Sequence, residues 1–516
     1  MSKSLFKSTS TVVSMTMISR VFGFIRDMIT AQLFGAGLLS DAFFVAFRIP
    51  NFMRRLFAEG SFSQAFVPVL SEYQKQKNPE EIKLFINSMA GTLGAVLLIV
   101  TFVGILFAPI IIRVFAPGFE VNGPRYDLAV MMLRITFPYL MLISLTAFSG
   151  AILNTYSRFW VAAFTPVFLN ISMIACAILL APHLHVPIVA LAWGVFIAGV
   201  VQLLFQWPFL KRLGLLPKPK INFKDAGVMK VLRLMVPALF GVSVSQINLL
   251  LDTLFASFLM VGSVSWLYFS DRLMEFPLGV FGVAISTVIL PHLSRHHATQ
   301  SKEDFSLTLD WAMRCVLLIG LPAGMVFAIA SGPLMSTLLQ YRTFDAEAVL
   351  MAHKSLSAFA IGIMPFMMIK VLAAGFYAKQ DTRTPVRIGI VAMVSNMVFN
   401  VILIWPLAHV GIALATSLAA LLNMSLLFYC LRKKGIYQPR SGWKDFSFRL
   451  IFANILLSVW LWIGSGDIHV WLTEHALWRS THLAVLLLAG VLIYFTGLWI
   501  SGLRPRHLLI PQRQIA

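Results

Sequence analysis

Apolar runs of about 20 residues recur from one end of the chain to the other, and each is long enough for a helix to cross a hydrocarbon layer about 30 Å thick. Backbone groups in lipid must bond within a helix or a closed barrel, and these runs are too long for barrel strands. The pattern therefore predicts an all-α polytopic membrane protein. We expect fourteen spans, near 11–35, 42–70, 86–113, 127–153, 160–182, 187–210, 229–258, 263–293, 307–332, 347–377, 387–407, 411–431, 447–464 and 482–502.

The composition excludes a soluble domain, because the chain is 59% hydrophobic and 12% charged, with a mean hydropathy of +0.83. Its formal net charge of +20 suggests nucleic acid or an anionic lipid surface as a partner. The location of the basic residues argues against nucleic acid. They are concentrated at the N-terminus and after even-numbered spans, as in 211–224 and 432–444, and the opposite loops hold few. The positive-inside rule then places both termini in the cytoplasm.

Two basic connectors divide the predicted spans into six, six and two. We expect a first lobe at 1–212, a cytoplasmic linker at 213–228, a second lobe at 229–432, a second linker at 433–446, and two further spans with a tail at 447–516. Three pairs of landmarks recur at nearly the same separation: Pro68 and Pro291, Pro138 and Pro365, and Asn170 and Asn396. Since six helices restore the starting side, the two lobes are expected to be parallel repeats with pseudo-twofold symmetry, a common transporter plan.

Charged residues inside the first two spans need an explanation, because a charge at bilayer depth costs about 2.5–3.5 kcal/mol even on the mild insertion scale. These residues are Arg20, Arg26, Asp27, Asp41, Arg48, Arg54, Arg55 and Glu59. Asp41, Arg48 and Arg55 share one helical stripe, and Asn51 and Arg54 lie on the adjacent strip. Arginine exceeds carboxylate here, and its forked donors suit phosphate oxygens. We therefore predict a water-filled cavity for an anionic cargo.

The eighth and tenth spans add further cavity candidates. Asp271, Arg272 and Glu275 occupy one turn of the eighth span, and Lys370 is a lone amine in the tenth. Two alternatives stay open. Arg20 with Asp27, and Arg272 with Glu275, are also candidates for structural ion pairs that bind nothing. Lys370 is equally suited to a paired role or to a position near the headgroups.

Asp252, Asn396, Asn400 and Thr416 are candidates for an oxygen-lined cation site, and ordinary interhelical hydrogen bonds are the alternative. No catalytic or nucleotide-binding motif is found: HExxH, GxSxG, the P-loop and Cys/His metal spacing are all lacking from the sequence. The three cysteines lie in apolar contexts typical of packing. Any pumping must therefore draw on the membrane potential, an ion gradient or a downstream sink, with no organic cofactor.

Three segments resemble the MurJ (MviN) family, the lipid II flippases of the MOP superfamily. They are 14–73 (SMTMISRVFGFIRDMITAQLFGAGLLSDAFFVAFRIPNFMRRLFAEGSFSQAFVPVLSEY), Ser270–Ala284 (SDRLMEFPLGVFGVA) and Gly375–Val386 (GFYAKQDTRTPV). The LNISMI stretch and the fourteen-span plan resemble the family too. The resemblance covers essentially the whole chain. It implies two six-helix, MATE-like lobes plus two extra C-terminal helices.

The resemblance also implies a function and a site. The family moves undecaprenyl-diphosphate-linked disaccharide-pentapeptide from the inner to the outer leaflet of the bacterial cytoplasmic membrane by alternating access, for cell-wall synthesis. Its essential cavity arginines match Arg20, Arg26, Arg54 and Arg272, and its important acidic residue matches Asp41. Some members bind sodium, but Asn400 stands where those members have a carboxylate. The implied partners are lipid II, membrane lipids and cell-wall synthesis proteins, and the chain is expected to be a monomer.

Three alternatives remain. The first is another MOP-superfamily transporter, either a flippase for a different lipid-linked oligosaccharide or a drug/ion antiporter. A cationic-drug exporter should carry carboxylates rather than arginines in its cavity. The second is a membrane enzyme acting on polyprenyl phosphates, which would need acid/base or metal-binding groups that the sequence lacks. The third is a membrane scaffold, which would not need buried arginines.

Overall fold

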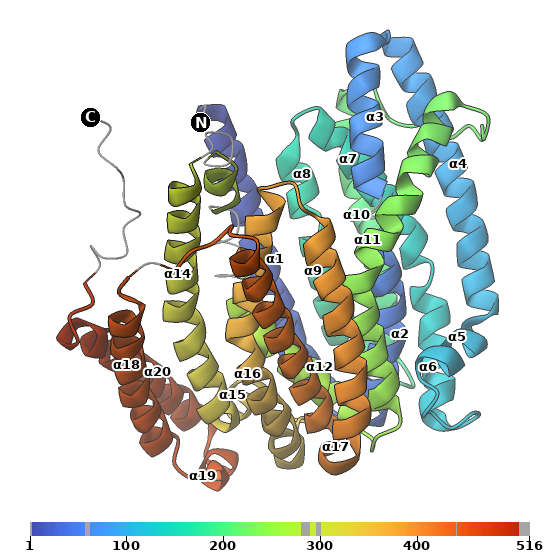
Figure 1. Ribbon diagram of the computed structural model, residues 1–516. Helices are drawn as coiled ribbons and strands as arrows, with labels where there is room; N and C mark the ends of the chain where they lie inside the picture. Colours follow the sequence, from blue (N-terminus) through green and yellow to red (C-terminus); the bar gives the residue numbers. More distant parts are fainter. Residues whose placement is uncertain (1–2, 57–61, 280–288, 296–300, 440, 505–516) are drawn as a thin grey trace. The chain divides into compact units, whose positions relative to one another are not determined.

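The computed structural model describes residues 3–56, 62–279, 289–295, 301–439 and 441–504, and this part of the chain is helical, with no strands (Figure 1). It forms two compact units, 1–265 and 266–516. The helices of the first unit are α1 (Lys3–Phe34), α2 (Leu38–Arg54), α3 (Ser63–Gln76), α4 (Pro79–Leu106), α5 (Ala108–Phe115), α6 (Pro124–Thr136), α7 (Tyr139–Thr155), α8 (Phe159–Phe164), α9 (Val167–Ala175), α10 (Val189–Arg212) and α11 (Ala226–Ser257). The second unit has α12 (Ser263–Pro277), whose first residues belong to the first unit, then α14 (Lys302–Ile329), α15 (Ser331–Leu339), α16 (Ala346–Tyr377), α17 (Arg383–Lys433), α18 (Trp443–Ser465), α19 (Ile468–Thr473) and α20 (Ala476–Ile500).

Several predicted spans are not single straight helices. The span predicted at 42–70 contains α2, π-helical residues at 55–56 and 62, and α3, while 57–61 lie outside the described residues. The span predicted at 127–153 is broken between α6 and α7, where Pro138 lacks the N–H that would continue the ladder. Conversely, α17 runs through two predicted spans and reverses at Ala408, whose φ is 49°. Just beyond this bend the Leu403 carbonyl oxygen lies 2.2 Å from where a Cβ on Gly411 would be, so only glycine fits.

Nine helical segments in the described part of the chain are long and apolar enough to cross a membrane. They include α4, α10, α16, α18 and α20. The prediction of a polytopic all-α membrane protein is therefore confirmed. The number fourteen stays a prediction.

Polar side chains fix where many helices begin. Asn78 precedes α4 and forms a capping box with Glu81, with Pro79 in the first helical position. Asp225, Ser301 and Asp345 accept backbone N–H groups at the starts of α11, α14 and α16. Each of these caps satisfies an N–H that has no partner within its own helix, and each contributes about 0.5–2 kcal/mol.

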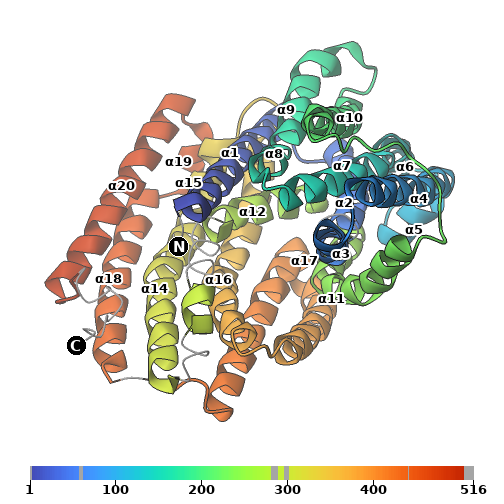
Figure 2. The same cartoon turned by 90° about the horizontal axis from the view of Figure 1, so that it is seen from above.

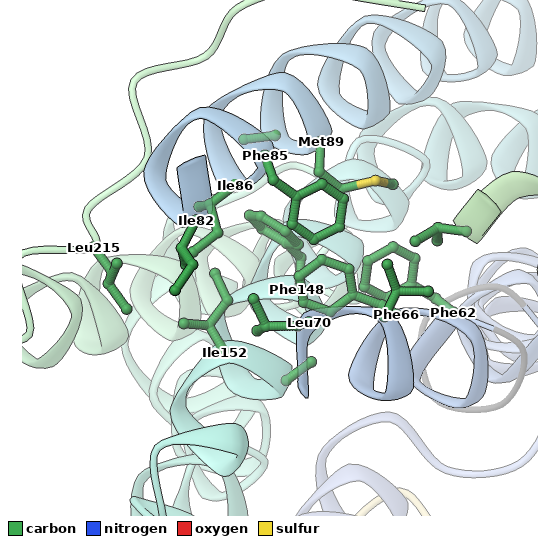
Figure 3. Close-up of a cluster of buried hydrophobic side chains, with 14 of the residues drawn as sticks. Phe62, Phe66, Leu70, Ile82, Phe85, Ile86, Met89, Phe148, Ile152 and Leu215 are labelled. Carbon is green, nitrogen blue, oxygen red and sulfur yellow. The ribbon is translucent and has the colours of Figure 1, made fainter. Parts of the chain in front are cut away.

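An aromatic core joins α3, α4 and α7 of the first unit (Figure 3). Phe66 of α3 lies between Phe85 of α4 and Phe148 of α7, with ring centroids 5.7 and 5.1 Å away. All three rings are almost fully buried. Burying a Phe side chain contributes about 1.5–3 kcal/mol, so this cluster sets the positions of α3, α4 and α7. It leaves the other face of α7 available to a cavity.

The connector after α10 runs along α4. The Lys218 N–H donates to the Asn87 side-chain oxygen (2.7 Å), and the Lys220 N–H donates to the Asn87 carbonyl (3.0 Å). The first unit includes α11, because α11 packs on α2, α3, α4 and α5. The predicted first lobe ended one helix earlier, at residue 212. The division of the spans into six, six and two stays a prediction.

Gly91 and Gly94 of α4 provide a matched pair for testing this connector. A Cβ on Gly91 would lie 2.4 Å from the Lys220 backbone, whereas a Cβ on Gly94 meets nothing within 4 Å. We expect Gly91→Ala to destabilise the protein by about 1–3 kcal/mol, as overpacking does. Gly94→Ala should stabilise the helix by about 0.5–1 kcal/mol. Thermal unfolding of the purified variants checks that the first variant is less stable, and the second more stable, than the unmodified protein. Equal midpoints for the two variants would contradict this packing.

In the second unit, α18 and α20 lie side by side, and α14 packs against α18 (Figures 1 and 2). The connector between α17 and α18 is held by Asp310 of α14, which accepts from the Tyr437 hydroxyl (2.7 Å) and from the Trp443 indole N–H (2.6 Å). Lys434 at its start binds Asp381 at 2.7 Å, and this contact lowers the pKa of Asp381 to about 2. The connector is therefore an ordered part of the unit.

Candidate functional site

A polar cavity of about 340 Å³ lies inside the first unit. Such a volume is at the lower end of the range, about 300–1,000 Å³, of small-molecule sites. Its described lining includes one charged side chain, Arg54, and no carboxylate. The lining residues are Ser19, Arg54, Ser63, Tyr139, Ile143, Thr146, Ala147, Gly150, Ala151, Asn154, Ala162, Thr165, Pro166, Leu169, Asn170, Gln202 and Gln206. A cationic group among uncharged polar groups favours an anionic ligand with additional hydrogen-bonding capacity.

Arg54 comes from the last turn of α2, just before the π-helical turn. Its Nε and Nη2 donate to the Asn51 side-chain oxygen at 3.1 and 2.8 Å. The two residues are neighbours three positions apart, as the helical periodicity predicted. Asn51 is uncharged, so it orients the guanidinium without neutralising it. Arg54 is half-buried and lines the cavity, and it therefore has the position expected of an anion-binding group.

Arg26 reaches the wall of the same cavity. Its Nη1 donates to the side-chain oxygen of Asn170 (3.0 Å), and Asn170 lines the cavity and donates to the Ser19 carbonyl (3.0 Å). Arg26 is only 8% exposed and also contacts Asp27 through Nε and Nη2, at 3.0 and 2.7 Å. The closest ion pair in α1 therefore joins Arg26 to Asp27, rather than Arg20 to Asp27. Arg20 is half-buried in the same helix.

The stripe of Asp41, Arg48 and Arg55 faces α11 and the start of α12. Arg48 donates to the Thr253 hydroxyl, and Arg55 donates to the Gln246 side-chain oxygen at 3.4 Å. The two partners are seven residues apart in α11, and the two arginines, Arg48 in α2 and Arg55 just after it, are also seven residues apart. The structure does not bring this stripe to the lining of the cavity. Asp41, Arg48 and Arg55 instead form a row of contacts with α11 and the start of α12, which we call the seam.

Asp41 lies at one end of this seam and is fully buried. It accepts from the N–H of Gly262 (2.7 Å) and from both the N–H and the hydroxyl of Ser265 (2.9 and 2.7 Å). Arg125 is 3.5 Å away. The sequence predicted Asp41 as a cavity residue. In the structure it joins α2 to Gly262 and Ser265 of the same unit, at the start of α12, where N–H groups need acceptors. Its role as a cavity residue stays a prediction.

The candidates of the second unit have local partners. Arg272 binds Glu275 at 2.5 Å and lies over the Tyr268 ring at 5.0 Å, and Asp271 is half-buried on the same helix. The Lys370 ammonium is 3.5 Å from the Leu278 carbonyl. The expected pair of Arg272 with Glu275 is therefore present. That Arg272 joins the arginines of the first unit around one cargo stays a prediction.

Two further predictions remain untested. Asn396, Asn400 and Thr416 form a chain of hydrogen bonds, from Asn400 to Asn396 (3.1 Å) and from Asn396 to Thr416 (3.3 Å). Asp252 belongs to the first unit and these three residues to the second, so the sodium site stays a prediction. Glu59, predicted as a cavity residue, lies outside the described residues.

Sequence reasoning missed most of the uncharged lining. Gln202 and Gln206 of α10 are both 1% exposed, and neither was predicted. A signal was present, because two glutamines four residues apart share one face of an otherwise apolar span. Polar side chains inside a membrane helix normally face the protein interior or a cavity. Thr146, Asn154 and Thr165 gave no comparable pattern.

Comparison with known proteins decides the family. The family model described as lipid II flippase MurJ matches residues 30–482. The chain belongs to the MurJ family. It is 48% identical to the probable lipid II flippase MurJ of Vibrio cholerae, covering 98% of each chain. It is 47% identical to the probable lipid II flippase MurJ of Haemophilus influenzae, covering 96% of this chain and 99% of that one.

The solved structures agree. A lipid II flippase MurJ in an inward closed conformation superposes with a TM-score of 0.79 at 26% identity, covering 95% of this chain and 98% of that one. An inward-facing MATE-family multidrug transporter of the MOP superfamily matches with a TM-score of 0.65 at 14% identity, over 82% of this chain and 97% of its own. At that identity the second match shows the fold alone. The predicted family and MOP-type fold are confirmed, and membership in MurJ makes the chain a transporter rather than an enzyme.

Proposed function

We propose that the chain is a lipid II flippase that moves the undecaprenyl-diphosphate-linked peptidoglycan precursor from the inner to the outer leaflet of the cytoplasmic membrane. The observation that supports this most directly is Arg54 on the lining of a polar cavity whose described walls carry no carboxylate. Membership in the MurJ family supplies the chemical identity of the cargo.

The physical problem is the diphosphate. Its negative charges must cross a low-dielectric layer, where an isolated ion costs tens of kcal/mol by Born solvation. A guanidinium in a hydrated cavity offsets that cost through charge-assisted, forked hydrogen bonds. Arg54 offers such a fork, and we propose that Arg26, and Arg272 of the second unit, contribute further donors during alternating access. The prenyl chain can stay in lipid while the headgroup crosses.

The orientation and energy source belong to the same proposal. The distribution of Lys and Arg supports cytoplasmic termini in a multi-pass inner-membrane protein. The membrane potential is a suitable energy source, because moving one charge through 100 mV is worth about 2.3 kcal/mol. A sodium gradient acting through Asp252, Asn396, Asn400 and Thr416 is the alternative. We propose that the protein acts as a monomer, alongside the enzymes of cell-wall synthesis.

Depletion of the protein in cells without another lipid II flippase tests the function. We expect lipid II accessible from outside to fall while total lipid II accumulates, measured with a leaflet-specific labelling or cleavage assay. Re-expression of the full chain should restore the outer pool. An unchanged outer pool after complete depletion would refute the proposal.

A further inference from the structure

One wall of the cavity in the first unit carries uncharged polar side chains, which supply no positive charge for binding a diphosphate. Two glutamines of α10 meet Thr165, which follows α8. The Gln206 amide N–H donates to the Thr165 hydroxyl (2.9 Å), and the Gln202 amide N–H donates to the Thr165 carbonyl (3.2 Å). The Tyr139 hydroxyl is 3.4 Å from the Gln202 side-chain oxygen. These contacts hold both side-chain amides in fixed orientations.

Two polar groups on this wall have capacity left for a ligand. Gln206 is 1% exposed, and its side-chain oxygen has no hydrogen-bond partner among the described residues. Leaving a buried acceptor unsatisfied is unfavourable, so such a group in a native site needs an explanation. Asn154 of α7 is half-buried and lines the cavity, and its side-chain amide makes no hydrogen bond within the described part of the chain. Together they offer a ligand one acceptor, the Gln206 side-chain oxygen, and both the donor and the acceptor of the Asn154 side-chain amide.

The two faces of α7 explain how the wall arises. Phe148 and Ile152 point into the aromatic core and fasten the helix there (Figure 3). Ala147, Gly150 and Asn154, spaced three and four residues apart, therefore fall on one different face, and all three line the cavity. Gly150 lies beside Gln206, with its Cβ position 3.7 Å from the Gln206 amide nitrogen. Small residues at 147 and 150 leave space next to the two amides.

The chemistry of this wall selects a class of ligand. Neutral amides paired with hydroxyls match groups that both donate and accept, such as sugar hydroxyls and N-acetyl amides. They offer no charge to a phosphate, and they are too polar for a prenyl chain. In a diphosphate-linked sugar, the first sugar is bonded directly to the phosphate. A group that binds the diphosphate, as proposed for Arg54, therefore needs the sugar-binding groups in the same cavity.

We propose that Asn154, Gln202 and Gln206 form a carbohydrate subsite, which binds the N-acetylated sugar attached to the diphosphate while Arg54 binds the diphosphate. This inference rests on the proposed function and names the part of the cargo that these residues recognise. The subsite distinguishes a glycosylated lipid from the bare prenyl diphosphate, and it makes the sugar a determinant of entry into the cavity.

Binding of two lipids to the purified full-length protein tests the subsite. The probes are lipid II and undecaprenyl diphosphate, which lacks the sugars and peptide, and the variants are Asn154→Ala and Gln206→Leu. We expect each variant to lower the affinity for lipid II by about tenfold and to leave that for undecaprenyl diphosphate unchanged, since a site built to hydrogen-bond a hydroxyl discriminates strongly. Asn154→Ala is the safer variant for folding because it breaks no hydrogen bond in the described structure. Asn154→Gln, which keeps the amide, should retain part of the preference.

The possible outcomes separate the two proposals. If Asn154→Ala and Gln206→Leu bind both lipids like the unmodified protein, while Arg54→Ala loses both, the subsite is refuted and the flippase proposal stands. An equal loss of both lipids in Asn154→Ala, or equal affinity of the unmodified protein for both, also refutes the subsite. If the unmodified protein binds neither lipid, the proposed function itself fails.

Discussion

Replacing Arg54 by alanine is expected to lower transport of lipid II strongly while leaving the protein folded and inserted. Arg54 is the charged side chain on the described lining of the cavity, and it donates two hydrogen bonds to Asn51 within its own helix. Hydrogen bonds to a charged group contribute about 1.5–3 kcal/mol each. Because 1.4 kcal/mol is a factor of ten, loss of the forked donor should lower transport by about ten- to a hundredfold or more.

The measurement is complementation of a depletion strain together with the outer-leaflet lipid II assay, at matched protein levels. Arg54→Lys keeps the charge but loses the fork, and should retain only partial activity. Arg158→Ala, at an exposed position of the same unit, is the matched control and should behave like the unmodified protein. Normal transport by Arg54→Ala would remove the proposed role of the cavity in binding the diphosphate.

Arg26 is a less selective position for this test. It bonds Asp27 and Asn170 and is 8% exposed, so its removal leaves a buried carboxylate without its closest counter-charge. Breaking a buried pair on one side typically costs about 3–5 kcal/mol. Loss of transport in Arg26→Ala would therefore combine an effect on cargo with an effect on folding. Arg54 separates the two effects.

Asp41→Ala is expected to reduce the free energy of unfolding by about 3–5 kcal/mol, the typical cost of removing one partner of a buried charged network. The carboxylate is fully buried and accepts from Gly262 and Ser265. Its removal leaves two N–H groups without acceptors and Arg125 without its carboxylate. The measured result should be a large drop in the thermal midpoint and in the yield of intact protein.

Asp127→Asn is the matched control for Asp41→Ala. Asp127 is exposed and lies two residues from Arg125 in α6, so its replacement should change stability by less than about 0.5 kcal/mol. Stability equal to that of the unmodified protein in Asp41→Ala, combined with a complete loss of transport, would contradict this account. It would instead support the predicted role of Asp41 as a cargo contact.

The region around α2 shows what helical periodicity can and cannot predict about a site. Periodicity correctly separated a stripe with Arg48 and Arg55 from a strip with Asn51 and Arg54. It did not indicate which strip faces the cavity, because both carry arginine. The answer depends on α11, which is far away in the sequence and supplies Gln246 and Thr253 opposite the first stripe. Because residues of α11 already bind the first stripe, the strip with Arg54 is the one that lines the cavity.

The sequence by itself determined the fold class, the presence of long apolar helices able to cross a membrane, and the family. These properties follow from local composition and from motifs, since the bilayer requires long apolar helices and tolerates charge only where function needs it. Only the tertiary structure decided that Asp41 binds Gly262 and Ser265, that Arg26 reaches Asn170, and that Gln202 and Gln206 share a cavity with Arg54. Those relations depend on which faces of distant helices pack together, and the periodicity of a single helix carries no information about its neighbours.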